Sequence, residues 1–263
     1  RELIASKNPS VLKWTPGFII RYLERILHQK EINAFLASCE DKFDEDFCDA
    51  VMEFLDLEVE VVGKENIPQN GKLVFAMNHP LGGLDAIALV SGLRNEAQKM
   101  KFIVNDLLLQ LGKMNGLFLG VNKFGKNTLS KRAQIDELFS SDNQVCIFPA
   151  GMVSRRNSGT IADLEWKKTF VTLSKPNDRQ IVPIHIAGRL SKFFYGLANF
   201  RKWLGIKVNI EMLYLSNELF KLKGSKIVLT VGTPIPSSTL TDDQTDLYWA
   251  QEIKKKVYLL GDK

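Results

Sequence analysis

A histidine and an aspartate in the first third of the chain have the residue types of a general base and its orienting carboxylate. His79 follows the apolar run Leu73–Met77, which indicates a buried strand, and Asp85 opens a helix-like segment after a Pro-x-Gly-Gly turn. A histidine bonded to a carboxylate can accept a proton while the carboxylate holds the imidazole in place. The pattern therefore predicts removal of a proton from a substrate hydroxyl.

The spacing of the pair makes a structural demand. Five residues separate His79 from Asp85. On one continuous helix six positions advance by about 600°, which would put the two side chains on opposed faces. Gly82 and Gly83 supply the backbone freedom for a turn instead. We therefore predict a turn at these glycines and a direct or single-water contact between the two side chains.

The chain after residue 56 alternates short apolar runs with helical stretches, which is typical of α/β proteins. We predict a mixed, largely parallel β-sheet flanked by helices, with reactive residues at the carboxyl ends of strands. Residues 1–56 are expected to form an N-terminal helical segment, and residues 57–263 the main domain. Expected strands are 57–62, 73–77, 101–104, 117–121, 145–148, 181–186, 207–213 and 226–231; expected helices are 18–27, 31–40, 44–55, 85–95, 127–140, 164–174, 191–203 and 242–260.

The composition is that of an ordinary globular protein, but the charges are unevenly distributed along the chain. The net charge is +5, yet residues 1–30 carry six Lys/Arg against two Glu, and residues 31–56 carry nine Asp/Glu against one Lys. Such segregation suits a negatively charged partner: anionic lipid headgroups, a phosphate-bearing substrate or an acidic carrier protein. The sequence contains no nucleic-acid recognition module, so nucleic acid is not an expected partner.

The cysteine content and the hydropathy of the sequence indicate where in the cell the protein is expected. The three cysteines form no CxxC pair and are odd in number, which favours a reducing compartment. No apolar stretch reaches the ~18 residues of a spanning helix, and no signal peptide is recognisable. We expect a cytoplasmic protein that can touch a membrane surface.

The predicted helix at 18–27 carries one apolar stripe with charged residues opposite it. The stripe fits an interfacial helix on a bilayer, with Lys13 and Trp14 at the headgroups, and equally a helix packed on its own domain. Both interpretations stay open at this point. The stripe consists of Phe18, Ile19, Tyr22, Leu23, Ile26 and Leu27.

Four motifs together resemble a known family. Asn78-His79…Asp85 resembles the first motif of the glycerophosphate and lysophosphatidic acid acyltransferase superfamily. The other three blocks occur in the family's order and at plausible separations. They are residues 116–123 (Gly-Leu-Phe-Leu-Gly-Val-Asn-Lys), 148–155 (Phe-Pro-Ala-Gly-Met-Val-Ser-Arg) and 181–185 (Ile-Val-Pro-Ile-His).

The resemblance implies transfer of a fatty acyl group from an acyl carrier protein or coenzyme A thioester to a hydroxyl of a lipid acceptor. His79 would be the general base and Asp85 its orienting partner, and the chemistry requires no metal or other cofactor. The protein would lie peripherally on the inner face of the cytoplasmic membrane. Substrate binding is assigned to Asn78, Lys123, Gly151, Arg155 and Arg156. The two arginines follow a predicted strand end and a glycine, where they either contact a phosphate or carboxylate or are solvated loop charges.

Departures from the family pattern bear on the acceptor. His79 and Asp85 are one residue further apart than usual, Ala150 replaces a usual glutamate, and Lys123 replaces a usual arginine. These variations resemble a bacterial branch that contains acyltransferases of ornithine or glycine lipids and proteins described as hemolysin-like. The acceptor is therefore lysophosphatidate, glycerol phosphate or a lyso-aminolipid. The alternative is a non-catalytic lipid-binding or membrane-perturbing protein on the same fold.

Four further segments could be functional or purely structural. His185 lies in an apolar strand and is expected to be packed rather than a second base. Lys126 either supplements Lys123 or lies on a surface loop. Residues 188–195 line an acyl groove or membrane edge, or place their aromatics in the core. Lys254-Lys255-Lys256 is expected to be a solvated helix face.

Overall fold

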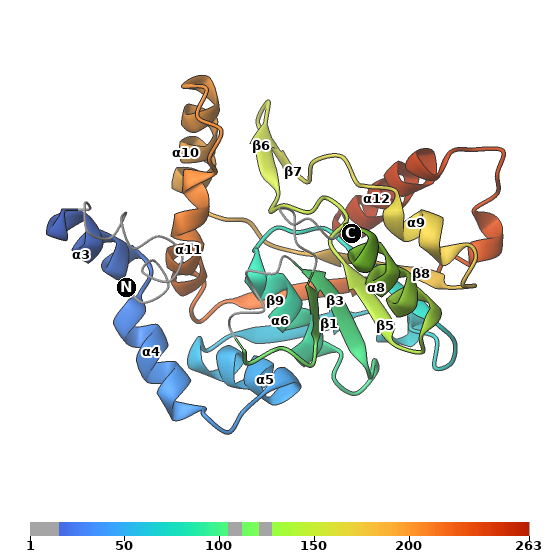
Figure 1. The fold of residues 1–263 in the computed structure, drawn as a ribbon, viewed down its shortest axis with the longest axis horizontal. Helices are drawn as coiled ribbons and strands as arrows, with labels where there is room; N and C mark the ends of the chain where they lie inside the picture. Colours follow the sequence, from blue (N-terminus) through green and yellow to red (C-terminus); the bar gives the residue numbers. More distant parts are fainter. Residues whose placement is uncertain (1–15, 105–111, 121–127, 263) are drawn as a thin grey trace. The chain divides into compact units, whose positions relative to one another are not determined.

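The computed structural model describes residues 16–104, 112–120 and 128–262 (Figure 1). The described residues form two compact units. A helical unit contains those up to residue 40 together with 192–221, and a sheet unit contains those of 41–191 and 222–263. The functional boundary expected at residue 56 stays a prediction.

The sheet unit is built on a seven-stranded sheet in the order β1-β9-β8-β2-β5-β3-β4. All neighbours are parallel except β8 and β9, which are antiparallel. This arrangement confirms the predicted mixed, largely parallel α/β fold. The strands are β1 (Glu58–Val62), β2 (Leu73–Met77), β3 (Met100–Val104), β4 (Phe118–Gly120), β5 (Gln144–Ile147), β8 (Gln180–Ile186) and β9 (Lys226–Val231).

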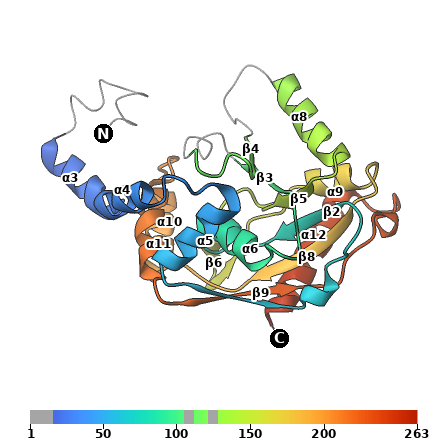
Figure 2. The same ribbon diagram turned by 90° about the horizontal axis from the view of Figure 1, so that it is seen from below.

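Strand β2 lies in the middle of this sheet, and all of its residues are buried. Val74 and Ala76 belong to a core cluster that includes Trp166, Phe170 and apolar residues of α12. Because side chains alternate across a strand, the residues between them face the other side, where they are also covered. Figures 1 and 2 show the helices around the sheet: α5 (Asp44–Phe54), α6 (Gly83–Gly92), α8 (Thr128–Ser140), α9 (Thr169–Ser174) and α12 (Asp246–Gly261).

The helical unit joins two parts of the chain that are far apart in sequence. The ring of His28, between α3 and α4, stacks on Phe220 with centroids 4.0 Å apart. Its Nε2 lies 3.1 Å from Asn217 Oδ1, so this corner is held against α11. The described helices of this unit are α3 (Gly17–Ile26), α4 (Gln29–Ser38), α10 (Lys192–Trp203), the 3₁₀ helix η2 (Ile210–Tyr214) and α11 (Leu215–Lys221).

The apolar stripe of α3 is only partly covered. Ile26 is buried, whereas Phe18, Ile19 and Tyr22 are exposed. Packing within the helical unit therefore accounts for the C-terminal part of the stripe. The membrane interpretation of its N-terminal part stays a prediction, and Lys13 and Trp14 lie outside the described residues.

The strand predicted at 207–213 is wrong. Residues 210–214 form η2, and Val208 is 71% exposed. The alternating apolar residues of this segment resemble a strand, but Glu211 is fully buried and bonded to Arg201 of α10. Pairing this carboxylate with a helical neighbour outweighs the β-propensity of the segment.

A small hairpin that begins at the last residue of the third block was not predicted. Strands β6 (Arg155–Asn157) and β7 (Thr160–Ala162) are antiparallel, with Asn157 opposite Thr160. The two connecting residues, Ser158 and Gly159, have φ of 47° and 91°. Positive φ at both positions is the geometry of a type I′ turn, which matches the twist of a two-residue hairpin.

Arg179 links several parts of the sheet unit from the inside. It is fully buried, and its guanidinium donates to five main-chain carbonyls at distances between 2.6 and 3.1 Å. A planar group with five donors can satisfy this many acceptors, whereas a lysine cannot. The carbonyls belong to Leu73, Leu138, Phe139, Ser141 and Asn143.

We predict that Arg179→Met lowers the free energy of unfolding by about 3 kcal/mol or more, because buried carbonyls lose their donor. Urea denaturation followed by circular dichroism measures the loss. Arg179→Lys should retain only part of the stability. Arg156→Met, at an exposed position, should change it by less than about 0.5 kcal/mol. Equal effects at positions 179 and 156 would contradict this role.

Candidate active site

The turn between β2 and α6 determines where His79 and Asp85 lie. Gly82 has φ 76° and ψ −136°, a conformation that residues with a side chain rarely adopt. Helix α6 begins at the next residue, and Asp85 occupies its first turn. The Asp85 carboxylate accepts hydrogen bonds from the N–H groups of Leu81, at 3.0 Å, and Gly82, at 3.1 Å. The turn predicted at Gly82 and Gly83 is therefore present.

The side chains of His79 and Asp85 are in direct contact. His79 Nδ1 lies 2.8 Å from Asp85 Oδ2, and the Asp85 side chain is completely buried. Burial raises the pKa of the Asp85 carboxyl, and the hydrogen bonds from His79 and Leu81 oppose this rise. When Asp85 is ionised its carboxylate can only accept, and the contact then requires the His79 proton on Nδ1 and leaves the lone pair on Nε2. The His79 side chain is 18% exposed.

The imidazole is also held across its face. Phe148, which follows β5, stacks on the His79 ring with centroids 4.2 Å apart and planes inclined by 23°. Phe102 of β3 stacks in turn on Phe148 at 6.2 Å. Two aromatic residues, one just after β5 and one in β3, therefore limit the orientation of the ring.

A buried aspartate that the sequence analysis missed holds the main chain of His79. Asp163 Oδ1 accepts from the His79 N–H at 3.2 Å and from the Ser154 hydroxyl at 2.6 Å, and its Oδ2 accepts from Trp166 Nε1 at 2.9 Å. The Ser154 N–H donates to the His79 carbonyl at 2.8 Å. Both main-chain groups of His79 are thus engaged by the segment that follows Phe148. No pattern in its own segment identifies Asp163, because its contacts to His79 and Tyr258 join positions 84 and 95 residues apart.

Helix α12 supports this segment from one of its faces. The Tyr258 hydroxyl accepts from the Asp163 N–H at 2.7 Å, and Lys254 Nζ donates to the carbonyls of Asp163 and Leu164 at 2.8 and 3.0 Å. Burial lowers the pKa of Lys254. The prediction that Lys254 belongs to a solvated face is therefore wrong, because its ammonium group caps main-chain carbonyls.

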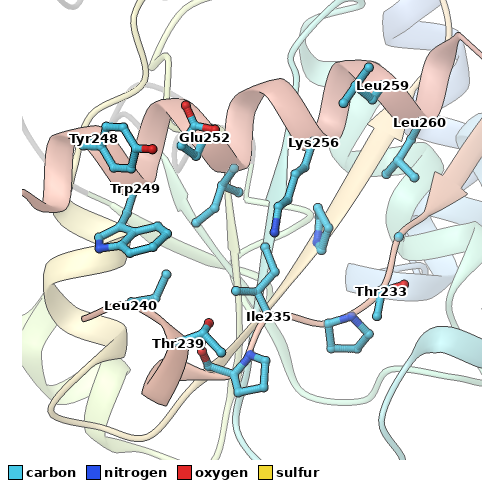
Figure 3. Close-up of a pocket in the computed structure, with 15 residues that line it drawn as sticks. Thr233, Ile235, Thr239, Leu240, Tyr248, Trp249, Glu252, Lys256, Leu259 and Leu260 are labelled. Carbon is cyan, nitrogen blue, oxygen red and sulfur yellow. Dashed lines mark hydrogen bonds between the residues drawn. The ribbon is translucent and has the colours of Figure 1, made fainter. Parts of the chain in front are cut away.

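Another face of α12 lines a pocket of about 800 Å³ (Figure 3). Glu252, Lys256 and Leu259 follow one another at the spacing of one helical face, as Gln251, Lys254 and Tyr258 do on the supporting face. Of the residues predicted for the active site, none that the structure describes lines this pocket. The helix separates the pocket's lining from the contacts to Asp163.

The predicted substrate-binding residues fall in different environments. Asn78 is buried, and its amide bonds both main-chain groups of Ile186, at 2.7 and 2.9 Å. The Gly151 N–H donates to the Phe148 carbonyl at 2.9 Å within a turn. Arg155 is buried and donates to the Val153 carbonyl, whereas Arg156 is exposed. Lys123 and Lys126 lie outside the described residues. A role of the assigned residues in substrate binding stays a prediction.

His185 is half-buried on β8. Its ring meets that of Tyr258 edge to face, with centroids 6.1 Å apart. Burial lowers its pKa, which favours the neutral imidazole. These contacts fit the packed residue that the sequence analysis expected.

Comparison with known proteins relates these features to a family. Residues 2–263 match the family model described as Acyltransferase. The chain is 46% identical to the lyso-glycine lipid O-acyltransferase of Bacteroides thetaiotaomicron over 261 residues, covering 98% of this chain and 96% of that protein. It is 45% identical to the protein of the same name from Phocaeicola vulgatus, with 98% and 93% coverage.

A solved structure shares the fold. The crystal structure of PlsC, the 1-acyl-sn-glycerophosphate (LPA) acyltransferase from Thermotoga maritima, superposes with a TM-score of 0.51. The match covers 83% of this chain and 78% of that one, at 20% sequence identity. The family match over nearly the whole chain and the two relatives show that this protein belongs to the acyltransferase family and is an enzyme that transfers acyl groups to lipid acceptors.

Proposed function

We propose that the enzyme transfers a fatty acyl group from a thioester to the hydroxyl of a lyso-glycine lipid, with His79 as general base and Asp85 as its orienting partner. The observation that carries the catalytic assignment is the 2.8 Å contact between His79 Nδ1 and the buried Asp85 Oδ2. The names of the relatives that are 46% and 45% identical over almost the entire chain support the acceptor.

In the proposed reaction His79 Nε2 takes the proton of the acceptor hydroxyl while the oxygen attacks the thioester carbonyl carbon. Asp85 stabilises the imidazolium that forms. The tetrahedral intermediate then collapses, the carbon–sulfur bond breaks, and the departing thiolate receives the proton from Nε2. General-base action of this kind contributes about 10²–10⁴-fold to the rate. No metal or cofactor takes part.

The main-chain contacts of His79 support a positioning role for Asp163. A general base must lie within hydrogen-bond reach of the hydroxyl, and a displacement of about 1 Å can cost 10²-fold in rate. Asp163 bonds the His79 N–H, and Ser154 bonds the His79 carbonyl. Asp163 touches no reacting atom in this proposal and acts through the placement of His79.

The acceptor's headgroup, the acyl donor and the location belong to the same proposal. Arg156 is exposed two residues after Ser154, whose N–H bonds the His79 carbonyl, and is the proposed contact for an anionic headgroup, together with Lys123. The donor is an acyl carrier protein or coenzyme A thioester, and the basic net charge of +5 suits either.

The enzyme works peripherally on the inner face of the cytoplasmic membrane. Among the described residues no helix has the length and apolar character needed to cross a bilayer.

The first prediction concerns the proposed base. His79→Ala should lower the rate of acyl transfer by about 10²–10⁴-fold, because proton removal loses its acceptor. The rate is measured with purified enzyme and labelled acyl carrier protein or coenzyme A thioester, with circular dichroism as the check on folding. Asp85→Asn should act in the same direction, whereas His185→Gln should remain close to wild type. Thiol release by His79→Ala at the wild-type rate would refute the mechanism.

The second prediction concerns the acceptor. With labelled donor, the wild-type enzyme should acylate lyso-glycine lipid faster than lyso-ornithine lipid, lysophosphatidate or glycerol phosphate. Thin-layer chromatography of the labelled products separates the four cases. Faster acylation of lysophosphatidate or glycerol phosphate would overturn the proposed acceptor while leaving the role of His79 intact.

The third prediction separates positioning from simple stability. Asp163→Asn should lower kcat by about 10²-fold at nearly unchanged KM for both substrates, because His79 moves but the binding groups do not. Ser154→Ala removes another bond to the same carboxylate without removing the His79 contact, and should lower kcat far less. If the two variants lose kcat equally on the folded fraction, Asp163 has no special role in placing His79.

A further inference from the structure

Large apolar side chains that lie exposed are concentrated in the helical unit. A short segment at the end of α10 holds five of them. Trp203 is 79% exposed and Val208 is 71% exposed. We call residues 200–208 the α10 tip; its exposed apolar residues are Phe200, Trp203, Leu204, Ile206 and Val208.

The α10 tip is an ordered reversal of the chain. The Gly205 N–H donates to the Lys202 carbonyl at 3.0 Å, and the Ile206 N–H donates to the Arg201 carbonyl at 3.1 Å. With Gly205 at φ 70°, these bonds make a Schellman motif, in which glycine ends the helix in the left-handed conformation. Figure 1 shows α10 and the chain that turns back toward α11. The exposed side chains are therefore presented by a defined backbone.

The interior of this reversal is polar. Arg201 Nε donates to Glu211 Oε2 at 2.9 Å, and Nη1 donates to the Ile206 carbonyl at 2.8 Å. The side chains of Arg201 and Glu211 are 7% and 0% exposed. The ion pair is inside and the apolar side chains are outside, which reverses the usual arrangement of a folded domain. Such a surface indicates a partner that supplies apolar contact.

The charge of the segment identifies the partner. No acidic residue occurs from Lys192 to Ile210, and Glu211 is neutralised by Arg201. Lys202 and Lys207 are exposed among the apolar residues. An apolar surface with interleaved lysines and a tryptophan matches the interface of an anionic bilayer, where lysines reach the headgroups and tryptophan lies at their level.

Two other partners fit less well. An acidic carrier protein is favoured by the two exposed lysines alone, whereas the segment presents five exposed apolar side chains. A second copy of the chain would bring like charges together. The lipid substrates of the enzyme also require access to a bilayer.

We propose that the α10 tip inserts into the headgroup region of a bilayer that contains anionic lipids and docks the enzyme on the membrane that holds its acceptor. This inference rests on the proposed function for the identity of the acceptor. The apolar side chains enter the boundary between headgroups and acyl chains, and the buried ion pair keeps the backbone of the tip in shape.

The test uses the full chain and sedimentation with vesicles of phosphatidylcholine, with or without phosphatidylglycerol. The triple variant Trp203→Ser/Ile206→Ser/Val208→Ser should lower the affinity for anionic vesicles by about 10-fold or more, since each apolar group no longer leaves water. Lys202→Gln/Lys207→Gln should lower it by a similar factor for anionic vesicles only, and added salt should reproduce this loss. The matched control Tyr248→Ser/Leu259→Ser, at exposed positions of α12, should bind like wild type.

Activity measurements distinguish this inference from the proposed function. The triple variant should acylate a detergent-dispersed acceptor at the wild-type rate and a vesicle-embedded acceptor more slowly. If the wild type acylates lyso-glycine lipid in neither form, the proposed function is wrong and the docking inference is unaffected. If both tip variants bind vesicles as tightly as the wild type does, the docking inference is wrong. It is also wrong if the tip variants abolish self-association or binding to a carrier protein while their vesicle binding persists.

Discussion

The buried carboxylate of Asp85 constrains the whole approach from β2 to α6, because an anion without water must find donors nearby. The N–H groups of Leu81 and Gly82 and the imidazole of His79 supply them, and the start of a helix adds a favourable dipole. These donors are close together only if the chain reverses at Gly82. The five residues between His79 and Asp85 are thus the length of one tight turn, and the pair meets without lying on one helix.

Much of the fold could be predicted because its signals are local. The central strand is a continuous apolar run, since both of its faces are covered, and the glycines of the site are next to the residues that they bring together. The His79–Asp85 contact was predictable for the same reason. The contacts of Asp163 to His79 and Tyr258 were not, because they join positions 84 and 95 residues apart and no pattern within one segment encodes them. The strand expected at 207–213 failed because its apolar alternation is outweighed by a buried ion pair with another helix.

Three cations have structural roles that could not be predicted from the sequence. Arg179 and Lys254 donate to main-chain carbonyls, and Arg201 divides its donors between a carboxylate and a carbonyl. Arg179 bonds carbonyls at the end of α8, where the helix itself leaves acceptors without partners. In a sequence such residues resemble solvated charges, because nothing adjacent to them shows which carbonyls they will reach. Their identity as structural groups depends on the assembled tertiary structure.

The sequence separation of these contacts also predicts the order in which they form during folding. The turn that joins His79 to Asp85 spans six positions and can close as soon as β2 and α6 form. The bonds from Asp163 to His79, and from Lys254 and Tyr258 to the Asp163 segment, each close a loop of more than 80 residues. Long loops close late in folding, because their entropic cost is met only after the elements between them have packed. We therefore expect the contact between His79 and Asp85 to form before the contact between Asp163 and the main chain of His79.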